Sequence, residues 1–76
     1  MERVTGKSKV ILEVLDELDK ARKKFAPMNS AHEGAAVIKE EYDELWDEVK
    51  ANNGPRAREE AVQVAAMALR FLIDLY

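Results

Sequence analysis

The chain has 76 residues, a net charge of −3 and no cysteine, which excludes disulfides and any metal site built on thiolates. A domain of this size buries only about 60% of the surface of its unfolded chain, so its core is marginal without a partner. No apolar run approaches the roughly 20 residues that span a bilayer, and no signal-peptide core is present. Basic residues form no stripe. We therefore expect a cytoplasmic protein that binds neither a membrane nor nucleic acid.

The N-terminal third of the chain predicts a helix from about residue 8 to 25. It ends before Pro27, because the residue that precedes a proline is disfavoured in the helical conformation. The basic run 20–24 falls in its last turns, where cations complement the helix dipole. We interpret this run as solvated charge at a helix end rather than as a phosphate site. The apolar positions of this helix are Val10, Ile11, Val14, Leu15, Leu18, Ala21 and Phe25.

A second helix is predicted from about residue 31 to 51, because Ser30 precedes Glu33 by three residues, as in a capping box. Projection at 100° per residue places six apolar side chains on one face of this helix. We expect the two aromatic residues among them to pack in the core, and the alternative is that they stack on a nucleobase. The six are Ala35, Ile38, Tyr42, Leu45, Trp46 and Val49.

Carboxylates follow the edge of that apolar face. Glu41 and Glu44 are one turn apart, which puts their Cβ atoms roughly 5–6 Å from each other, and Glu48 continues the strip. Glu59 and Glu60 begin the next helix. Carboxylates beside a helix seam lose hydration and repel one another unless a cation lies with them, and oxygen ligands of this kind suit Mg²⁺. The alternatives are a solvated face for the first pair and simple complementation of the helix dipole for Glu60.

The third helix is predicted from about residue 55 to the end, after a turn at 52–55 that contains glycine and proline. From Ala61 to Tyr76 it is apolar almost all round, so it must be covered on several sides. Arg70 lies in this apolar segment, and we expect it to pair with an acidic residue across an interface. The predicted fold class is all-α: residues 1–76 form one domain, a three-helix subunit that makes a helical bundle by oligomerisation. A crowded monomeric core is the alternative.

Two short motifs carry a resemblance to a known family. The pattern Glu40-Glu41-x-x-Glu44-Leu45, followed by Glu59-Glu60-x-x-Gln63-Val64, resembles the MazG-like branch of the all-α nucleoside triphosphate pyrophosphohydrolases over roughly residues 30–76. The resemblance implies a homodimer or homotetramer that uses Mg²⁺, or Mn²⁺, to cleave a nucleoside triphosphate into the monophosphate and pyrophosphate. By position, it implies that Glu41, Glu44 and Glu60 are the catalytic metal ligands.

The second motif departs from the family at one position, because Gln63 stands where the family has an aspartate. An amide oxygen can bind Mg²⁺ but supplies no charge. Gln63 or Glu48 would then complete the ligand set. Removal of one carboxylate also leaves a second hypothesis open, in which the chain is a non-catalytic helical binding or oligomerisation module of the same fold.

Three further residues are candidates for contact with the substrate. Arg56 and Arg58 lie beside the proposed ligands and can neutralise phosphates, and His32 begins the second helix, from which it could reach a base or a phosphate. The alternative is that all three are ordinary surface residues at helix starts. With one histidine and no cysteine, a nucleophilic triad is excluded.

Overall fold

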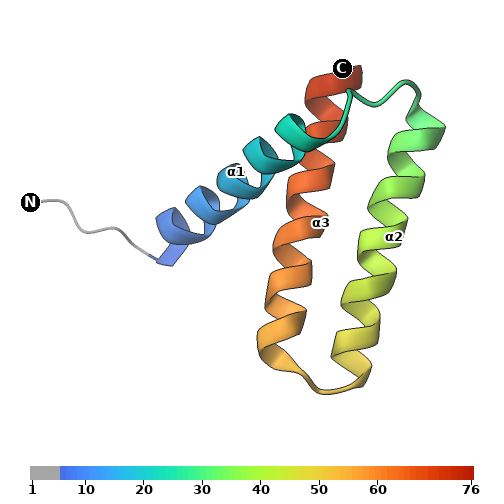
Figure 1. The fold of residues 1–76 in the computed structure, drawn as a ribbon. Coiled ribbons are helices and arrows are strands. Elements are labelled where there is room, and N and C mark those ends of the chain that lie inside the picture. The colour runs from blue at the N-terminus through green and yellow to red at the C-terminus, as the bar shows by residue number, and fades with distance from the viewer. Residues whose placement is uncertain (1–5) are drawn as a thin grey trace, which may run out of the picture.

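The computed structural model describes residues 6–76 as three helices without a strand: α1 (Gly6–Lys24), α2 (Ala31–Lys50) and α3 (Gly54–Leu75). Helices α2 and α3 form a long antiparallel hairpin, and α1 crosses the outside of α3 at an angle (Figure 1). The predicted all-α class is confirmed, and each predicted boundary lies within two residues of the observed one. None of these three helices is long and apolar enough to cross a membrane.

Local polar contacts fix the starts of α2 and α3. The Ser30 hydroxyl accepts a hydrogen bond from the backbone N–H of Glu33 (3.1 Å), as predicted, and the Glu33 carboxylate accepts one from the N–H of Asn29 (3.2 Å). At α3, the Asn53 side chain accepts a hydrogen bond from the N–H of Arg56 (3.2 Å). Asn52 precedes it with φ of 57°, a left-handed conformation that asparagine tolerates. The tight 51–53 connection therefore brings the carboxylates of α2 opposite the first turns of α3.

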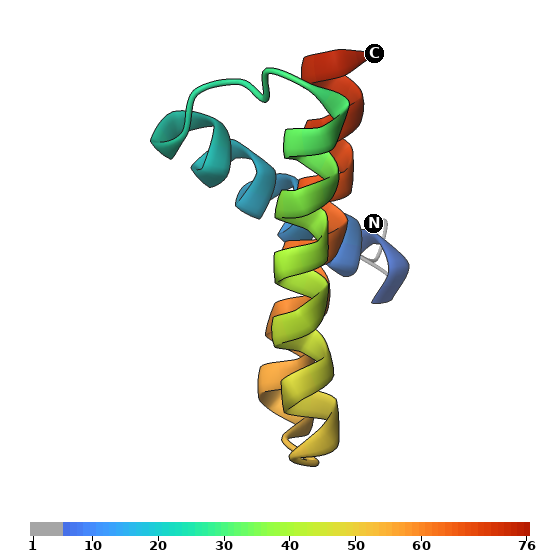
Figure 2. The same cartoon turned by 90° about the vertical axis from the view of Figure 1, so that its right-hand side faces the viewer.

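Helix α3 is the centre of the fold, because α1 and α2 both pack on it and not on each other within the described residues. Figure 2 shows α1 and α2 on different sides of α3. Ala66 is completely buried, and this small side chain allows the helices to approach closely. The core is small. Its buried members are Leu18, Ala21, Ala66 and Met67, with Val14, Val37, Ile38 and Leu69 packed around them.

The face of α2 that meets α3 differs from the predicted one. Tyr42 and Trp46 are 49% and 48% exposed, so the prediction that they lie in the core is wrong for the single chain. The contact of Gly34 with Phe71 explains the difference, because a Cβ atom at Gly34 would lie only 2.4 Å from the Phe71 ring. With Gly34 against Phe71, α2 is rotated about its own axis so that the later positions on the face of Gly34 point toward α3. The buried or half-buried positions are Gly34, Val37, Ile38, Glu41, Leu45 and Glu48.

A buried charged cluster holds the 25–30 connection on the C-terminal end of α3. Arg70 Nε lies 3.6 Å from Asp74 Oδ2, and their side chains are only 7% and 4% exposed. Arg70 also donates to the carbonyl of Ala26 (2.7 Å), and Asp74 accepts from the N–H of Met28 (3.0 Å). The prediction that Arg70 pairs with an acidic residue across an interface is therefore wrong in this chain, because its partner lies one turn along the same helix.

Candidate metal centre

Three glutamates from two helices meet where the middle of α2 faces the first turns of α3. Glu41 and Glu44 come from α2 and Glu60 from α3, and each offers a carboxylate oxygen within 4.8 Å of the other two. Glu41 and Glu60 are half-buried and Glu44 is exposed, so the cluster lies at the mouth of the seam. The structure thus brings together the three residues that the sequence predicted as ligands. Carboxylate oxygens at this spacing can share one divalent cation.

The electrostatics of the cluster are unfavourable without a cation. Partial burial, followed by the nearby Glu44 carboxylate, raises the pKa of Glu41 from 4.5 to about 7. The same two causes, in the same order, raise the pKa of Glu60. Loss of hydration and mutual repulsion both penalise the ionised forms. A bound cation would relieve both costs, because it replaces water as the partner of the carboxylates.

Glu48 and Arg56 lie near the cluster but outside its closest group. The charge of Glu48 contributes to the raised pKa of Glu60, whereas that of Arg56 opposes it. Glu48 is half-buried on the same face as Glu41, two turns away. Its position is compatible with the predicted role as an additional ligand, which stays a prediction. Arg56 is close enough to attract an anion that binds beside Glu60, and its side chain also lies 3.8 Å from Glu59.

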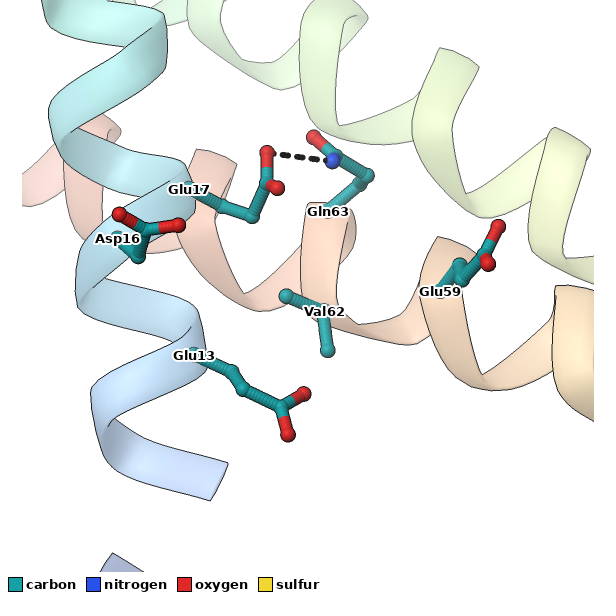
Figure 3. Close-up of a pocket in the computed structure, with 6 residues that line it drawn as sticks. All are labelled: Glu13, Asp16, Glu17, Glu59, Val62 and Gln63. Atoms are coloured by element: carbon teal, nitrogen blue, oxygen red, sulfur yellow. Dashed lines mark hydrogen bonds between the residues drawn. The ribbon is translucent and has the colours of Figure 1, made fainter. Parts of the chain in front are cut away.

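Gln63, the departure from the family pattern, is held by α1. Its side-chain nitrogen donates a hydrogen bond to Glu17 Oε2 at 2.8 Å, and Figure 3 shows the two side chains pointing toward each other. Both residues line a cavity of about 300 Å³ between α1 and α3. The amide is thus oriented by a carboxylate that the sequence analysis did not single out. A direct bond from Gln63 to a metal stays a prediction.

The remaining candidates do not join the cluster. Arg58 binds Glu13 of α1 through both terminal nitrogens, at 2.6 and 3.0 Å, which fastens α1 to the start of α3. His32 is exposed in the first turn of α2. It precedes Glu41 by nine residues, which corresponds to roughly 13 Å along the helix axis. Contact of His32 with a substrate would therefore need a ligand that extends well beyond the three carboxylates, and contact of Arg58 would compete with its ion pair to Glu13.

Two cavities open beside Glu41, and sequence reasoning did not anticipate either. One, of about 350 Å³, lies against the last turns of α1 and is bounded by Lys20, Lys24 and Gln63. The other, of about 420 Å³, lies under the 25–30 connection against Phe25 and Val37. The sequence signal for the first cavity is the basic run 20–24, which we interpreted as solvated charge at a helix end. Only the crossing angle of α1 places part of that run beside Glu41.

Comparison of the chain with protein-family models, with curated proteins and with solved structures finds no match.

Proposed function

We propose that this chain is a Mg²⁺-dependent nucleoside triphosphate pyrophosphohydrolase that acts in the cytoplasm as a homo-oligomer. The convergence of Glu41, Glu44 and Glu60, with oxygens within 4.8 Å of one another, is the observation that supports it best. The raised pKa values of Glu41 and Glu60 add that burial and nearby carboxylates disfavour the ionised forms of these two residues. The motif resemblance supplies the reaction class, cleavage between the α- and β-phosphates.

The roles of the residues follow from their positions. Glu41, Glu44 and Glu60 would hold Mg²⁺ or Mn²⁺, with Glu48 or the Gln63 amide available as a further ligand. When bound, the ion would neutralise phosphate oxygens and lower the pKa of a bound water. One carboxylate of the cluster would orient the attacking water, and its exposed mouth, at Glu44, leaves room for a triphosphate. Arg56 would attract the phosphates beside Glu60.

The exposed apolar surface supports an oligomer. No large side chain of the described residues is fully buried, and Tyr42, Trp46 and Val49 form a strip on α2 that is nearly half exposed. These residues recur at i, i+4 and i+7, which is the spacing of a helix-packing face. Leu72 and Ile73 at the end of α3 are exposed by 56% and 53%. A homodimer or homotetramer would cover these side chains and give the small core the additional burial that it lacks.

The test is pyrophosphate release from a panel of nucleoside and deoxynucleoside triphosphates, standard and modified, with Mg²⁺ or Mn²⁺. We expect metal-dependent release by the wild type and none above background from Glu41→Gln, which keeps the shape of the side chain but removes its charge. Glu59→Gln is the matched control, because Glu59 is exposed beside Glu60 and does not belong to the cluster. Its activity should equal that of the wild type.

A non-catalytic module of the same fold is the second candidate. Gln63 favours it, because its neutral amide, whose nitrogen donates to Glu17, stands where the family pattern has a charged ligand. Such a module would bind the metal and an oligomeric partner without turnover. Absence of pyrophosphate from every substrate, in a preparation shown to be oligomeric by sedimentation, would rule out the enzyme and leave this candidate.

A further inference from the structure

The two cavities beside Glu41 form one groove. They share Phe25, Glu41 and Met67 in their walls, so the groove runs between the end of α1 and the middle of α2, with α3 as its floor. Its two halves enclose about 350 and 420 Å³. A volume of this order is typical of sites for small molecules. Glu41 is the only ligand candidate of the three-carboxylate cluster that lines both halves, so it joins the groove to the metal centre.

One half of the groove is lined by two lysines together with two glutamates. Lys20 and Lys24, one turn apart on α1, both line it, and the neighbouring Lys23 does not; Glu17 and Glu41 are the acidic residues of this half. Lys20 Nζ lies 3.1 Å from the Asp16 carboxylate and 3.6 Å from that of Glu17, and both raise the pKa of this ammonium group, Asp16 the more, so Lys20 stays charged at physiological pH. Lys24 Nζ lies 5.3 Å from the centre of the Phe25 ring. Lysine ammonium groups beside a metal-binding carboxylate are suited to phosphate oxygens.

The other half combines hydrophobic and charged side chains. Phe25, Pro27, Val37 and Met67 supply its hydrophobic walls, and its polar lining residues are Asn29, Glu33, Glu40, Glu41 and Arg70. Phe25 is 51% exposed. The Lys24 ammonium and the Arg70 guanidinium both lie over its ring, the guanidinium at 5.5 Å from the ring centre. An exposed aromatic ring between apolar side chains and a polar amide fits a flat heteroaromatic group.

We propose that this groove is the nucleotide-binding site. Lys20 and Lys24 contact the phosphates, and Phe25 receives the base together with the hydrophobic side chains under the 25–30 connection. This assignment rests on the proposed function and adds α1 to the site, which the motif residues alone do not include. It places the phosphates between two ammonium groups and the metal-binding face of Glu41. The base then lies under the 25–30 connection, which the Arg70–Asp74 pair fastens to α3.

The test measures binding by isothermal titration calorimetry, so it does not depend on turnover. The probes are the α,β-imido analogues of the four deoxynucleoside triphosphates and inorganic tripolyphosphate, each with Mg²⁺. For the double variant Lys20→Gln/Lys24→Gln, we expect the dissociation constants of both probe types to rise about tenfold or more, which corresponds to roughly 1.4 kcal/mol. Lys23→Gln is the matched control and should bind like the wild type. Phe25→Ala should weaken the nucleotides and leave tripolyphosphate unchanged.

Melting curves of all variants control for folding, since the substituted lysines are exposed. The proposal is overturned if the double variant binds both probes as tightly as Lys23→Gln, or if the wild type binds no probe. Failure of the proposed function has a different signature: tight binding that depends on both lysines, with no release of pyrophosphate from the hydrolysable nucleotides. In that case the groove binds nucleotide without cleaving it.

Discussion

Two regions of the molecule place charged side chains at buried or half-buried positions, and they differ in how those charges are compensated. Near the C-terminal end of α3, Arg70 and Asp74 are almost fully buried, and each finds an opposite charge and a backbone partner. Where the middle of α2 faces the first turns of α3, Glu41 and Glu60 are half-buried beside Glu44, and nearby carboxylates repel them. Among residues 6–76, the first arrangement pairs opposite charges, whereas the second gathers like charges. The first holds the fold together, and the second is the cluster on which the proposed cation site rests.

The difference also separates two effects that sequence patterns confuse. A charged residue in an apolar helix is costly unless it is paired, so Arg70 and Asp74 are explained by the 25–30 connection that they anchor. For Glu60, Arg56 lowers the pKa, but burial and the neighbouring carboxylates raise it by more; burial and carboxylates also raise the pKa of Glu41. A bound proton or a cation would supply the charge that relieves this repulsion.

The largest expected effect is the loss of the paired cluster. Asp74→Ala leaves the Arg70 guanidinium buried without its carboxylate and removes the acceptor of the Met28 N–H. Breaking a buried pair in this way should lower the free energy of unfolding by about 3 kcal/mol, measured by urea denaturation. Asp43→Ala, which breaks the exposed pair of Asp43 with Lys39, is the control and should cost about 0.5 kcal/mol or less. Equal losses from the two variants would mean that the buried cluster is no structural anchor.

The next effect is stabilisation by metal. Divalent cation that binds only the folded chain should stabilise it by about 2.7 kcal/mol at a hundredfold excess over the dissociation constant. Melting curves with and without Mn²⁺ measure this, and we expect a higher Tm for the wild type and for Asp74→Ala, but not for Glu44→Gln. A rise in Tm that Glu44→Gln retains would place the metal elsewhere on the protein.

A smaller effect is the pH dependence of stability. The pKa of Glu41 is raised to about 7 in the folded state from 4.5, so the folded chain holds this proton more tightly than the unfolded chain does. The contribution of this group to the stability of the metal-free protein should therefore be complete below pH 4.5 and be lost as the pH rises from 4.5 to about 7. Because solvent screens the site, we expect a loss of about 1 kcal/mol. Glu41→Gln should remove that loss and melt higher than the wild type at pH 8; a lower melting temperature would contradict the repulsion.

Helical periodicity and local signals were enough to predict the fold class and every helix end to within two residues. The capping box at Ser30 and the turn before Pro55 are local features, and the structure has both. The carboxylate cluster was also predictable, since Glu41 and Glu44 share a helix face and a short turn brings Glu60 opposite them. These predictions depend only on residues close in sequence or joined by a tight connection.

The rest depended on contacts between distant segments. The rotation of α2 follows from the contact of Gly34 with Phe71, and a projection of α2 alone cannot contain it. The partner of Gln63 is Glu17, 46 residues earlier, and depends on the crossing angle of α1. The same angle decides that Lys20 and Lys24 line a cavity while Lys23 does not. Patterns within single helices thus predicted the cluster of three glutamates but not the groove beside it.

Direct titration with Mn²⁺, followed by the electron paramagnetic resonance signal of the free ion, tests the central claim that the three glutamates form a cation site. The account predicts saturable binding by the wild type, with the signal suppressed until the sites are filled, and no such binding by Glu41→Gln or Glu44→Gln. Glu59→Gln should titrate like the wild type. A free Mn²⁺ signal that is as strong with the wild type as in buffer alone would contradict the account, if the protein is near 1 mM, because a site with a Kd of that order (about −4 kcal/mol) would still bind about half of the first metal added.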